Sequence, residues 1–301
     1  MKKNTVVAIL FLCTCNSFSQ NILNRVSPNV EEETNKKNEG ASTSVEGKLL
    51  EPYKYPYVDD RDIYWSTVVW ERIELSEKKN FQLYFPTDTT KIDKRRISLF
   101  DALLRGVYNK SIKEVYSSEY FLPEHKLTLE EVKDNLNKLD TLPKGFEQLN
   151  AGEPISKEFI DKLSIVAADI VSYKIKGMWY FNKKMGELKY RILAICPVGP
   201  DVSEKKSENP DLVELFWVWY SDARKDLYNT VVFNPNNKSS HYNFDDILNS
   251  RRFSSVIYKE ENTYEDRGIN DYIKENATLQ LIESERIKER VRNFELDVWQ
   301  Y

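Results

Sequence analysis

Residues 170–196, IVSYKIKGMWYFNKKMGELKYRILAIC, decide the fold that this sequence predicts. Apolar and polar side chains alternate along residues 170–181 and again along residues 187–196, which is the period of a strand with one covered face. Between the two runs, Asn182 to Gly186 supplies the polar residues and the glycine of a turn. The stretch therefore predicts an antiparallel β-hairpin.

The aromatic stretch at residues 212–220, LVELFWVWY, predicts a third strand. It is apolar on both faces, which suits either a covered central strand or a strand that carries a contact surface. Extended segments are also expected at 81–86, 231–233 and 254–258.

Helices are expected around this sheet. Capping residues and helical spacing predict them at 63–73, 99–107, 128–139, 156–166, 221–228 and 244–248. A long charged helix is expected at 278–299, because Ile287, Val291, Phe294 and Val298 form one apolar stripe. The sequence therefore predicts an α+β fold.

A weak internal repeat suggests two lobes of similar build. The run Phe100-Asp101-Ala102-Leu103-Leu104 is similar to the run Phe244-Asp245-Asp246-Ile247-Leu248, and a tryptophan-containing segment ending in proline precedes each. The expected division is an N-terminal lobe over residues 49–155 and a C-terminal lobe over residues 156–301.

The N-terminus has the pattern of an export signal. Lys2 and Lys3 precede a short apolar run, and cleavage is expected between Ser19 and Gln20, which makes residues 1–19 a signal peptide. The apolar run is about half of the ~20 residues that a membrane span needs. A lipoprotein signal that uses Cys15 is the alternative. Residues 20–48 are polar and predict a disordered leader.

Signal removal changes what the composition implies. It takes away two lysines and two cysteines, so the net charge goes from −4 to −6 and Cys196 is left as the single cysteine. Such a chain has no internal disulfide and depends on its core. Its slightly acidic balance gives no basic surface of the kind that binds nucleic acid or an anionic membrane.

The residues that commonly carry chemistry do not assemble into an active site in this sequence. The nine glycines lie at least seven residues apart, which excludes the glycine-rich loops of nucleotide-binding folds. His125 and His241 have no second ligand at metal-binding spacing. Asp245 and Asp246 form an acid pair, but adjacent helical residues point apart. We therefore expect no enzyme, no cofactor and no metal.

Aromatic clusters are the remaining signal. Trp217 and Trp219 share one face of the third predicted strand, and Trp179 lies in the hairpin. These rings are either part of a sheet core or the lining of a groove in a periplasmic glycan- or peptide-binding module.

The order of several sequence blocks resembles the GldN (PorN) family of Bacteroidetes gliding motility and type IX secretion proteins. The resemblance covers about residues 53–301. It rests on Val69-Trp70-Glu71-Arg72-Ile73, Leu83-Tyr84-Phe85-Pro86, Trp179-Tyr180-Phe181-Asn182-Lys183, Leu215-Phe216-Trp217-Val218-Trp219-Tyr220, Asn234-Pro235-Asn236-Asn237, Arg251-Arg252-Phe253-Ser254-Ser255 and Glu295-Leu296-Asp297-Val298-Trp299. Gly177 departs from the family pattern, which has an acidic residue at this position.

The resemblance implies a non-enzymatic periplasmic structural protein. Members of the family associate with the outer-membrane lipoprotein GldK (PorK) in a ring at the inner face of the outer membrane, and they contact the motor proteins GldL and GldM. From the residues alone we expect the protein interface near the aromatic strand and the polar loop that follows residue 233. The candidates are Phe216, Trp217, Trp219, Asn236, Asn237 and His241.

Overall fold

The computed structural model describes residues 22–24, 51–88, 96–141, 148, 150, 157–232 and 242–299. The expected signal peptide lies outside these ranges, and so does most of the expected leader. Residues 22–24 are the exception, because they form a 3-10 turn, η1 (Ile22–Asn24), with Leu23 buried. The expectation of disorder is wrong for these three residues.

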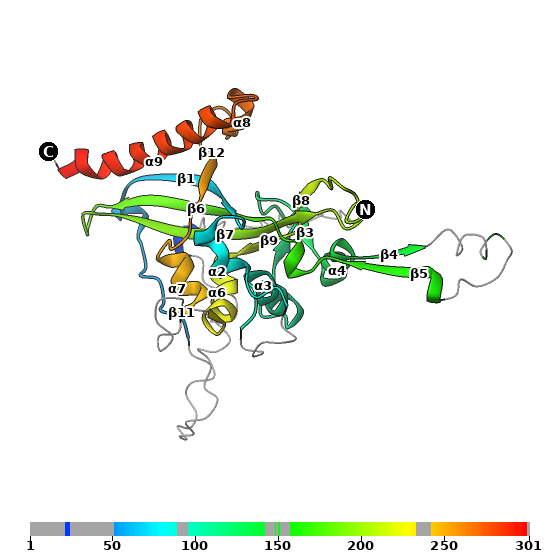
Figure 1. Cartoon of the computed structure of the whole chain (residues 1–301). Coiled ribbons are helices and arrows are strands. Elements are labelled where there is room, and N and C mark those ends of the chain that lie inside the picture. Colours follow the sequence, from blue (N-terminus) through cyan, green and yellow to red (C-terminus); the bar gives the residue numbers. More distant parts are fainter. Residues whose placement is uncertain are drawn as a thin grey trace, which may run out of the picture.

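One antiparallel sheet dominates the chain, as Figure 1 shows. Its strands follow the order β12-β1-β6-β7-β9-β2-β3, and β8 pairs with β7. The predicted hairpin is confirmed as β6 (Ser172–Asn182) and β7 (Glu187–Pro200), with Ile175 opposite Ile195. All of the pairings in the sheet are antiparallel. The α+β prediction is confirmed.

The third predicted strand is interrupted. Residues 212–220 form β8 (Leu212–Glu214), a break, and β9 (Trp217–Trp219), and Tyr220 already begins a helix. The break occurs because Leu215 and Phe216 both enter the same apolar core, so the alternation of a strand is lost between them. Extended structure is therefore found where the sequence predicts it, but as two short strands instead of one continuous strand.

Helices cover one face of the sheet. They include α3 (Leu99–Tyr108), α6 (Tyr220–Tyr228) and α7 (Phe244–Asn249), close to where the sequence predicts them. Ser98 caps α3 by accepting a hydrogen bond from the Asp101 backbone N–H. Their apolar faces and that side of the sheet form the largest core, which contains Ile73, Ile195 and Val218.

Other elements are short. They are η2 (Asp60–Asp62), η3 (Lys78–Asn80), α2 (Phe81–Tyr84), β2 (Val115–Tyr116), η4 (Pro123–His125), β3 (Lys126–Leu127), α4 (Leu129–Leu136), η6 (Ala167–Asp169), β10 (Val231–Val232), β11 (Tyr242–Asn243), β12 (Val256–Glu260) and α8 (Ile269–Tyr272). The capping box predicted at Thr128 is present at the start of α4. No helix within the described ranges has both the length and the apolar character that crossing a membrane requires.

Three local predictions are wrong. Residues 63–73 are not helical but belong to β1 (Ile63–Glu74), and residues 81–84 form α2 instead of an extended segment. The helix expected at 156–166 is η5 (Lys157–Phe159) followed by β5 (Ile160–Ser164). Trp70 and Ile73, which would share one face of a helix, point into different cores on opposite sides of the sheet, so tertiary burial overrides the helical spacing.

A two-stranded arm leaves the body, as Figure 1 shows on the right. It consists of β4 (Asn137–Thr141) and β5, paired from Asn137 opposite Ser164 to Thr141 opposite Ile160. The sequence predicts helix for part of both strands. Leu139 is 67% exposed on this arm.

The predicted long helix is confirmed as α9 (Ala277–Trp299), which packs on β12. Ile287 of α9 enters a small core with Val69 and Ile257, and Phe294 stacks on Trp65 with ring centroids 4.5 Å apart. Strand β1 comes from the expected N-terminal lobe, yet it pairs with β6 and β12, which belong to the expected C-terminal lobe. A boundary at residue 155 therefore does not separate two sheets.

Candidate functional site

The aromatic residues expected at an interface are buried. Phe216 and Trp217 have no exposed surface and Trp219 is 8% exposed. The ring centroids of Phe121 and Trp219 are 4.1 Å apart. The Trp217 indole N–H donates a hydrogen bond to the Glu214 carboxylate over 2.6 Å. The expectation of a contact surface on this strand required Phe216, Trp217 and Trp219 to be exposed. They are buried, because the loop that carries Phe121 covers the two tryptophan rings. Asn236, Asn237 and His241 lie outside the described residues.

The tryptophans expected in a ligand groove do not form one. Trp179 is half-buried and packs on Tyr190, with ring centroids 4.9 Å apart, beside the small core under α9. Trp217 and Trp219 belong to a different core, on the side of the sheet where Leu23 also packs. A stacking site needs rings exposed in one concave surface, which this arrangement does not supply.

The candidate acid pair serves the fold. Asp245 is buried and accepts two hydrogen bonds from the Arg224 guanidinium, at 3.0 and 2.9 Å, and one from the Tyr220 hydroxyl at 2.8 Å. Asp246 is exposed, and its backbone N–H donates to the Asn243 cap. The two carboxylates therefore do not face a common substrate position.

Cys196 is also placed in the core. It is fully buried, and this burial raises the pKa of its thiol well above the ordinary value. A thiol in that state is a poor nucleophile. Among the described residues no three His, Cys, Asp or Glu side chains gather in a way that would hold a metal ion.

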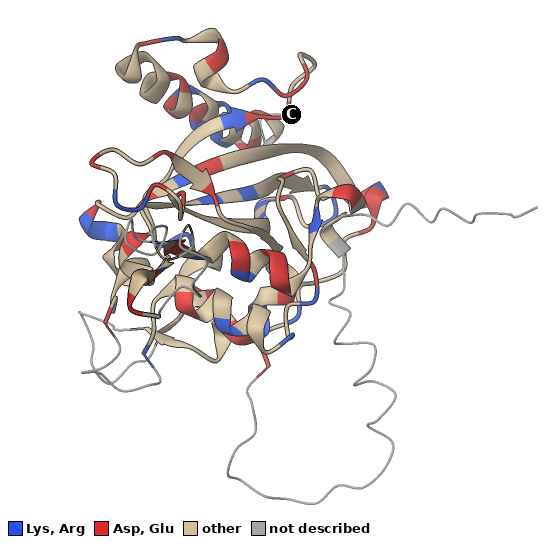
Figure 2. Cartoon of the chain, turned by 90° about the vertical axis from the view of Figure 1, so that its right-hand side faces the viewer, with Lys and Arg blue, Asp and Glu red and all other residues tan. Residues whose placement is uncertain are grey.

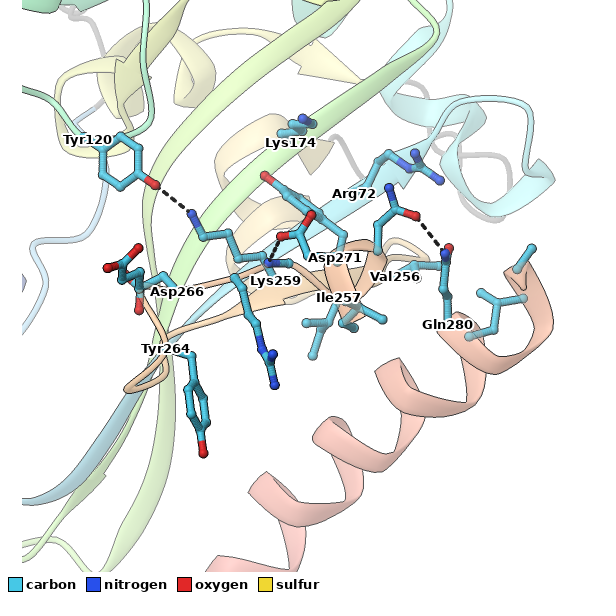
Figure 3. Close-up of a pocket in the computed structure, with 18 residues that line it drawn as sticks. Arg72, Tyr120, Lys174, Val256, Ile257, Lys259, Tyr264, Asp266, Asp271 and Gln280 are labelled. Atoms are coloured by element: carbon cyan, nitrogen blue, oxygen red, sulfur yellow. Dashed lines mark hydrogen bonds between the residues drawn. The ribbon is translucent and has the colours of Figure 1, made fainter. Parts of the chain in front are cut away.

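A polar cleft of about 870 Å³ opens between β12, the loop that follows it, α8 and the start of α9. Figure 3 shows its lining. Arg72 and Lys174 reach it from β1 and β6, Lys259 from β12, and Tyr120 from the loop after β2. Ile257 of β12 is buried in the small core with Val69 and Ile287, and it lines the cleft together with Tyr258.

The lysines of the cleft are held by acids and rings of the chain itself. Lys259 Nζ donates to Glu119 over 2.5 Å and to the Tyr120 hydroxyl over 3.1 Å, and it lies 4.6 Å from the centre of the Trp70 ring. Those partners raise the pKa of Lys259, although its partial burial opposes the shift. Lys174 pairs with Glu214 at 2.6 Å.

The loop between β12 and α8 presents the outer wall of the cleft. Asp266 and Asp271 accept hydrogen bonds from backbone N–H groups of the same loop, so their carboxylates fix its shape. The exposed Arg267 guanidinium lies between Tyr264 and Tyr272, 4.8 and 5.0 Å from their ring centres. Arg267 has no carboxylate partner among the described residues, and Tyr264 is 67% exposed.

This lining suits recognition of another protein. It offers an exposed guanidinium, exposed phenol rings and hydrogen-bonding groups, which are the residue types enriched where proteins bind each other. Elsewhere Figure 2 shows acidic and basic residues interspersed over helices and loops. Sequence reasoning missed the cleft, because its walls come from segments that are distant in the chain. The alternation of residues 256–260 beside an aromatic and charged loop was the available signal.

Comparison with known proteins gives one finding. The family model described as GldN, gliding motility associated protein GldN, matches residues 58–300. No curated protein matches the chain. The matched range includes the whole sheet, the arm, the cleft and α9.

Proposed function

Because the chain belongs to the GldN family of gliding motility associated proteins, we propose that it is a non-enzymatic structural subunit of the machinery for gliding and type IX secretion. In this proposal the mature chain works in the periplasm. It forms a ring with the outer-membrane lipoprotein GldK (PorK) at the inner face of the outer membrane, and it contacts the motor proteins GldL and GldM. The observation that carries the proposal is the family match over residues 58–300.

The shape of the chain supports a role in assembly. A ring requires head-to-tail contacts, so each subunit needs two different contact surfaces. The β4–β5 arm projects from one side of the body in Figure 1, and α9 and the loop next to it lie at another. The arm is an isolated two-stranded ribbon, which is marginal by itself and gains from pairing or packing against another chain.

We assign the arm to the contact between neighbouring subunits. Its exposed Leu139 is an apolar side chain without a covering element among the described residues. Leu139→Asp is expected to reduce ring formation with the lipoprotein, measured by size-exclusion chromatography and electron microscopy of the co-expressed proteins. Leu212→Asp is the matched control, because Leu212 is 54% exposed but lies on the body.

We assign the polar cleft to the contact with a protein partner. Arg267→Ala combined with Tyr264→Ala should weaken co-purification of the mature chain with the GldK-like lipoprotein. Arg61→Ala is the control, because Arg61 is also highly exposed and, within the described part of the chain, pairs with Asp59 alone. Both proteins should keep the circular dichroism spectrum of the unmodified chain.

The central test is co-purification with a GldK-like lipoprotein and export in a deletion strain. We expect a complex, and loss of type IX export when the gene is deleted. A chain that stays monomeric and unbound in the presence of the lipoprotein, in cells whose export is unaffected by the deletion, contradicts the proposal. Fractionation should find the mature protein in the periplasm, and with the outer membrane only when the lipoprotein is present.

A further inference from the structure

Helix α9 has a second face that the body does not use. Its inner face packs through Ser284, Ile287 and Val291, which are buried. The outer face carries six exposed residues at alternating spacings of three and four, the spacing of a coiled-coil seam. They are Leu279, Ile282, Arg286, Glu289, Asn293 and Leu296.

We propose that this outer stripe pairs with the same stripe of a second copy of the chain, with the two helices antiparallel. The two-fold axis passes between Ile287 and Lys288. In that register Arg286 faces Glu289 of the partner subunit, and the apolar ends meet, because Leu279 faces Leu296 of the partner subunit. The contact is isologous, since each side contributes the same surface.

The charges beside the stripe also suit this register. Glu283 and Glu285 lie in the first half of the helix, and Arg290 and Arg292 lie in the second half. In the antiparallel register Glu283 lies beside Arg290 of the partner subunit, and Glu285 lies beside Arg292 of the partner subunit. These are the flanking positions that select partner and orientation in coiled coils.

A parallel pair would have the opposite electrostatics. Arg286 would face Arg286 of the partner subunit, and Glu289 would face Glu289 of the partner subunit, so like charges would meet in the seam. Like charges in contact are destabilising. The sequence of the stripe therefore selects the antiparallel arrangement.

The charged residues can change partners at small cost. Within one chain Arg286 pairs with Glu283 and Lys288 pairs with Glu285, each at 2.7 Å. Arg286 and Glu285 are 71% and 65% exposed, whereas their partners Glu283 and Lys288 are 15% and 30% exposed. An ion pair with one partner in water contributes little to stability, so a second copy can compete for the exposed Arg286 and Glu285 side chains.

The body leaves room for the contact. In Figure 1, α9 lies across β12 at the upper edge of the sheet, and its C-terminal part stays against the body, where Phe294 stacks on Trp65. Because the inner face of α9 rests on the body, two paired helices would carry their bodies on opposite sides. The stripe runs along α9 from Leu279 to Leu296, which corresponds to about 26 Å of seam.

This inference goes beyond the proposed function. A two-fold contact is complete with two copies, so it cannot build a ring by itself, and it needs no lipoprotein. It would join two subunits of one assembly, or two assemblies. Half of the seam positions are polar or charged, so the isolated chain should dimerise weakly.

Charge exchange in the seam tests the proposal on the mature chain alone. Sedimentation velocity over a concentration series should show a monomer–dimer equilibrium. Arg286→Glu and Glu289→Arg should each weaken the dimer at least about tenfold, because each places like charges together twice. The double variant should recover the dimer, and an equal mixture of the two single variants should form a heterodimer.

The control is Lys184→Glu, which makes the same charge change at an exposed position in the β6–β7 turn and should not alter the dimer. Recovery by the double variant and by the mixture cannot come from a general effect of charge. If neither restores association, or if the chain is monomeric throughout the series, the proposal is wrong.

A cross-linking experiment tests the direction of the helices. Leu279→Cys mixed with Leu296→Cys should form a disulfide between copies on mild oxidation, whereas neither variant should dimerise covalently alone. The native Cys196 is buried and does not interfere. Covalent dimers of the single variants without the mixed species would overturn the antiparallel register. Ring formation with the lipoprotein is measured separately, so failure here leaves that proposal intact.

Discussion

Removing the charge of Arg251 should strongly destabilise the fold, because it leaves the carboxylate of Glu71 buried without its ion-pair partner. Glu71 on β1 has no exposed surface, and it accepts hydrogen bonds from Arg251 Nη1 and Nη2 at 2.9 and 2.8 Å. The Ser255 hydroxyl donates to the same carboxylate. The pair joins the central sheet to the turn after α7, across 180 residues of chain.

Arg251→Met keeps an unbranched apolar side chain at this position and removes the guanidinium, which donates both hydrogen bonds to Glu71 and lies over the Tyr190 ring, with Cζ 4.1 Å from the ring centre. Breaking a buried ion pair by removing one partner costs about 3–5 kcal/mol. The Arg251 side chain is 26% exposed, so water can replace part of its contact, and we expect about 3 kcal/mol, at the lower end of that range. For a chain of this size this corresponds to a fall in Tm of about 6–12 °C.

The stability lost in Arg251→Met should be larger at neutral pH than at acidic pH. Burial alone would raise the pKa of Glu71, but the charge and hydrogen bonds of Arg251 lower it below the ordinary value. The stability from Glu71 is therefore complete above its unfolded pKa and is lost as the pH falls through the folded pKa. Without Arg251, burial raises the pKa of Glu71. The stability difference between Arg251→Met and the unmodified chain should therefore shrink as the pH falls from 7 towards about 4.5.

Urea denaturation of the mature chain, followed by circular dichroism at several pH values, measures both effects. Arg72→Met is the matched control, because Arg72 lies beside Glu71 but is 51% exposed and pairs with Glu74. It should cost less than about 1 kcal/mol. Adding Glu71→Gln to Arg251→Met should recover stability at pH 7, because no buried charge remains. The reasoning would be refuted if Arg251→Met lost no more free energy of unfolding than Arg72→Met, or if its loss did not change with pH.

Three further predictions follow from the packing. Gly177→Ala should cost about 1–3 kcal/mol in urea denaturation, because the added Cβ would lie 2.1 Å from the Tyr190 hydroxyl, whose ring is packed in the core; unchanged stability would show that the ring moves freely. Cys196 should resist alkylation at pH 8 in the folded chain and react at once in denaturant, which mass spectrometry would show. Deleting residues 20–24 should lower the free energy of unfolding by about 1.5–3 kcal/mol, because Leu23 is buried and its carbonyl accepts a hydrogen bond from Arg191; an equal stability would show that this turn does not contribute.

Elements whose pattern depends only on neighbouring residues were predictable. The β6–β7 hairpin follows from alternation on both sides of a polar turn, and α9 follows from one apolar stripe in a charged helix. The caps at Ser98 and Thr128 also follow from local chemistry. In each case the side chains that fix the structure lie within a few residues of one another.

Elements that depend on distant partners were not predictable. Residues 63–73 have the spacing of a helix, yet β6 and β12 place them between two strands, and β12 lies far along the chain. The same holds for the arm, because β4 and β5 are strands only through each other. Local spacing cannot show which segment will pair with a strand.

The sequence by itself determined the family, the α+β class and the absence of recognisable catalytic motifs. Only the tertiary structure decided which aromatic side chains face water. Trp217 and Trp219 pack against Phe121 in the core that also contains Leu23, whereas Tyr264 and the outer stripe of α9 remain exposed. The reason is physical, because the composition of a segment sets how much it gains from burial, but the segments that fold over it decide whether it is buried.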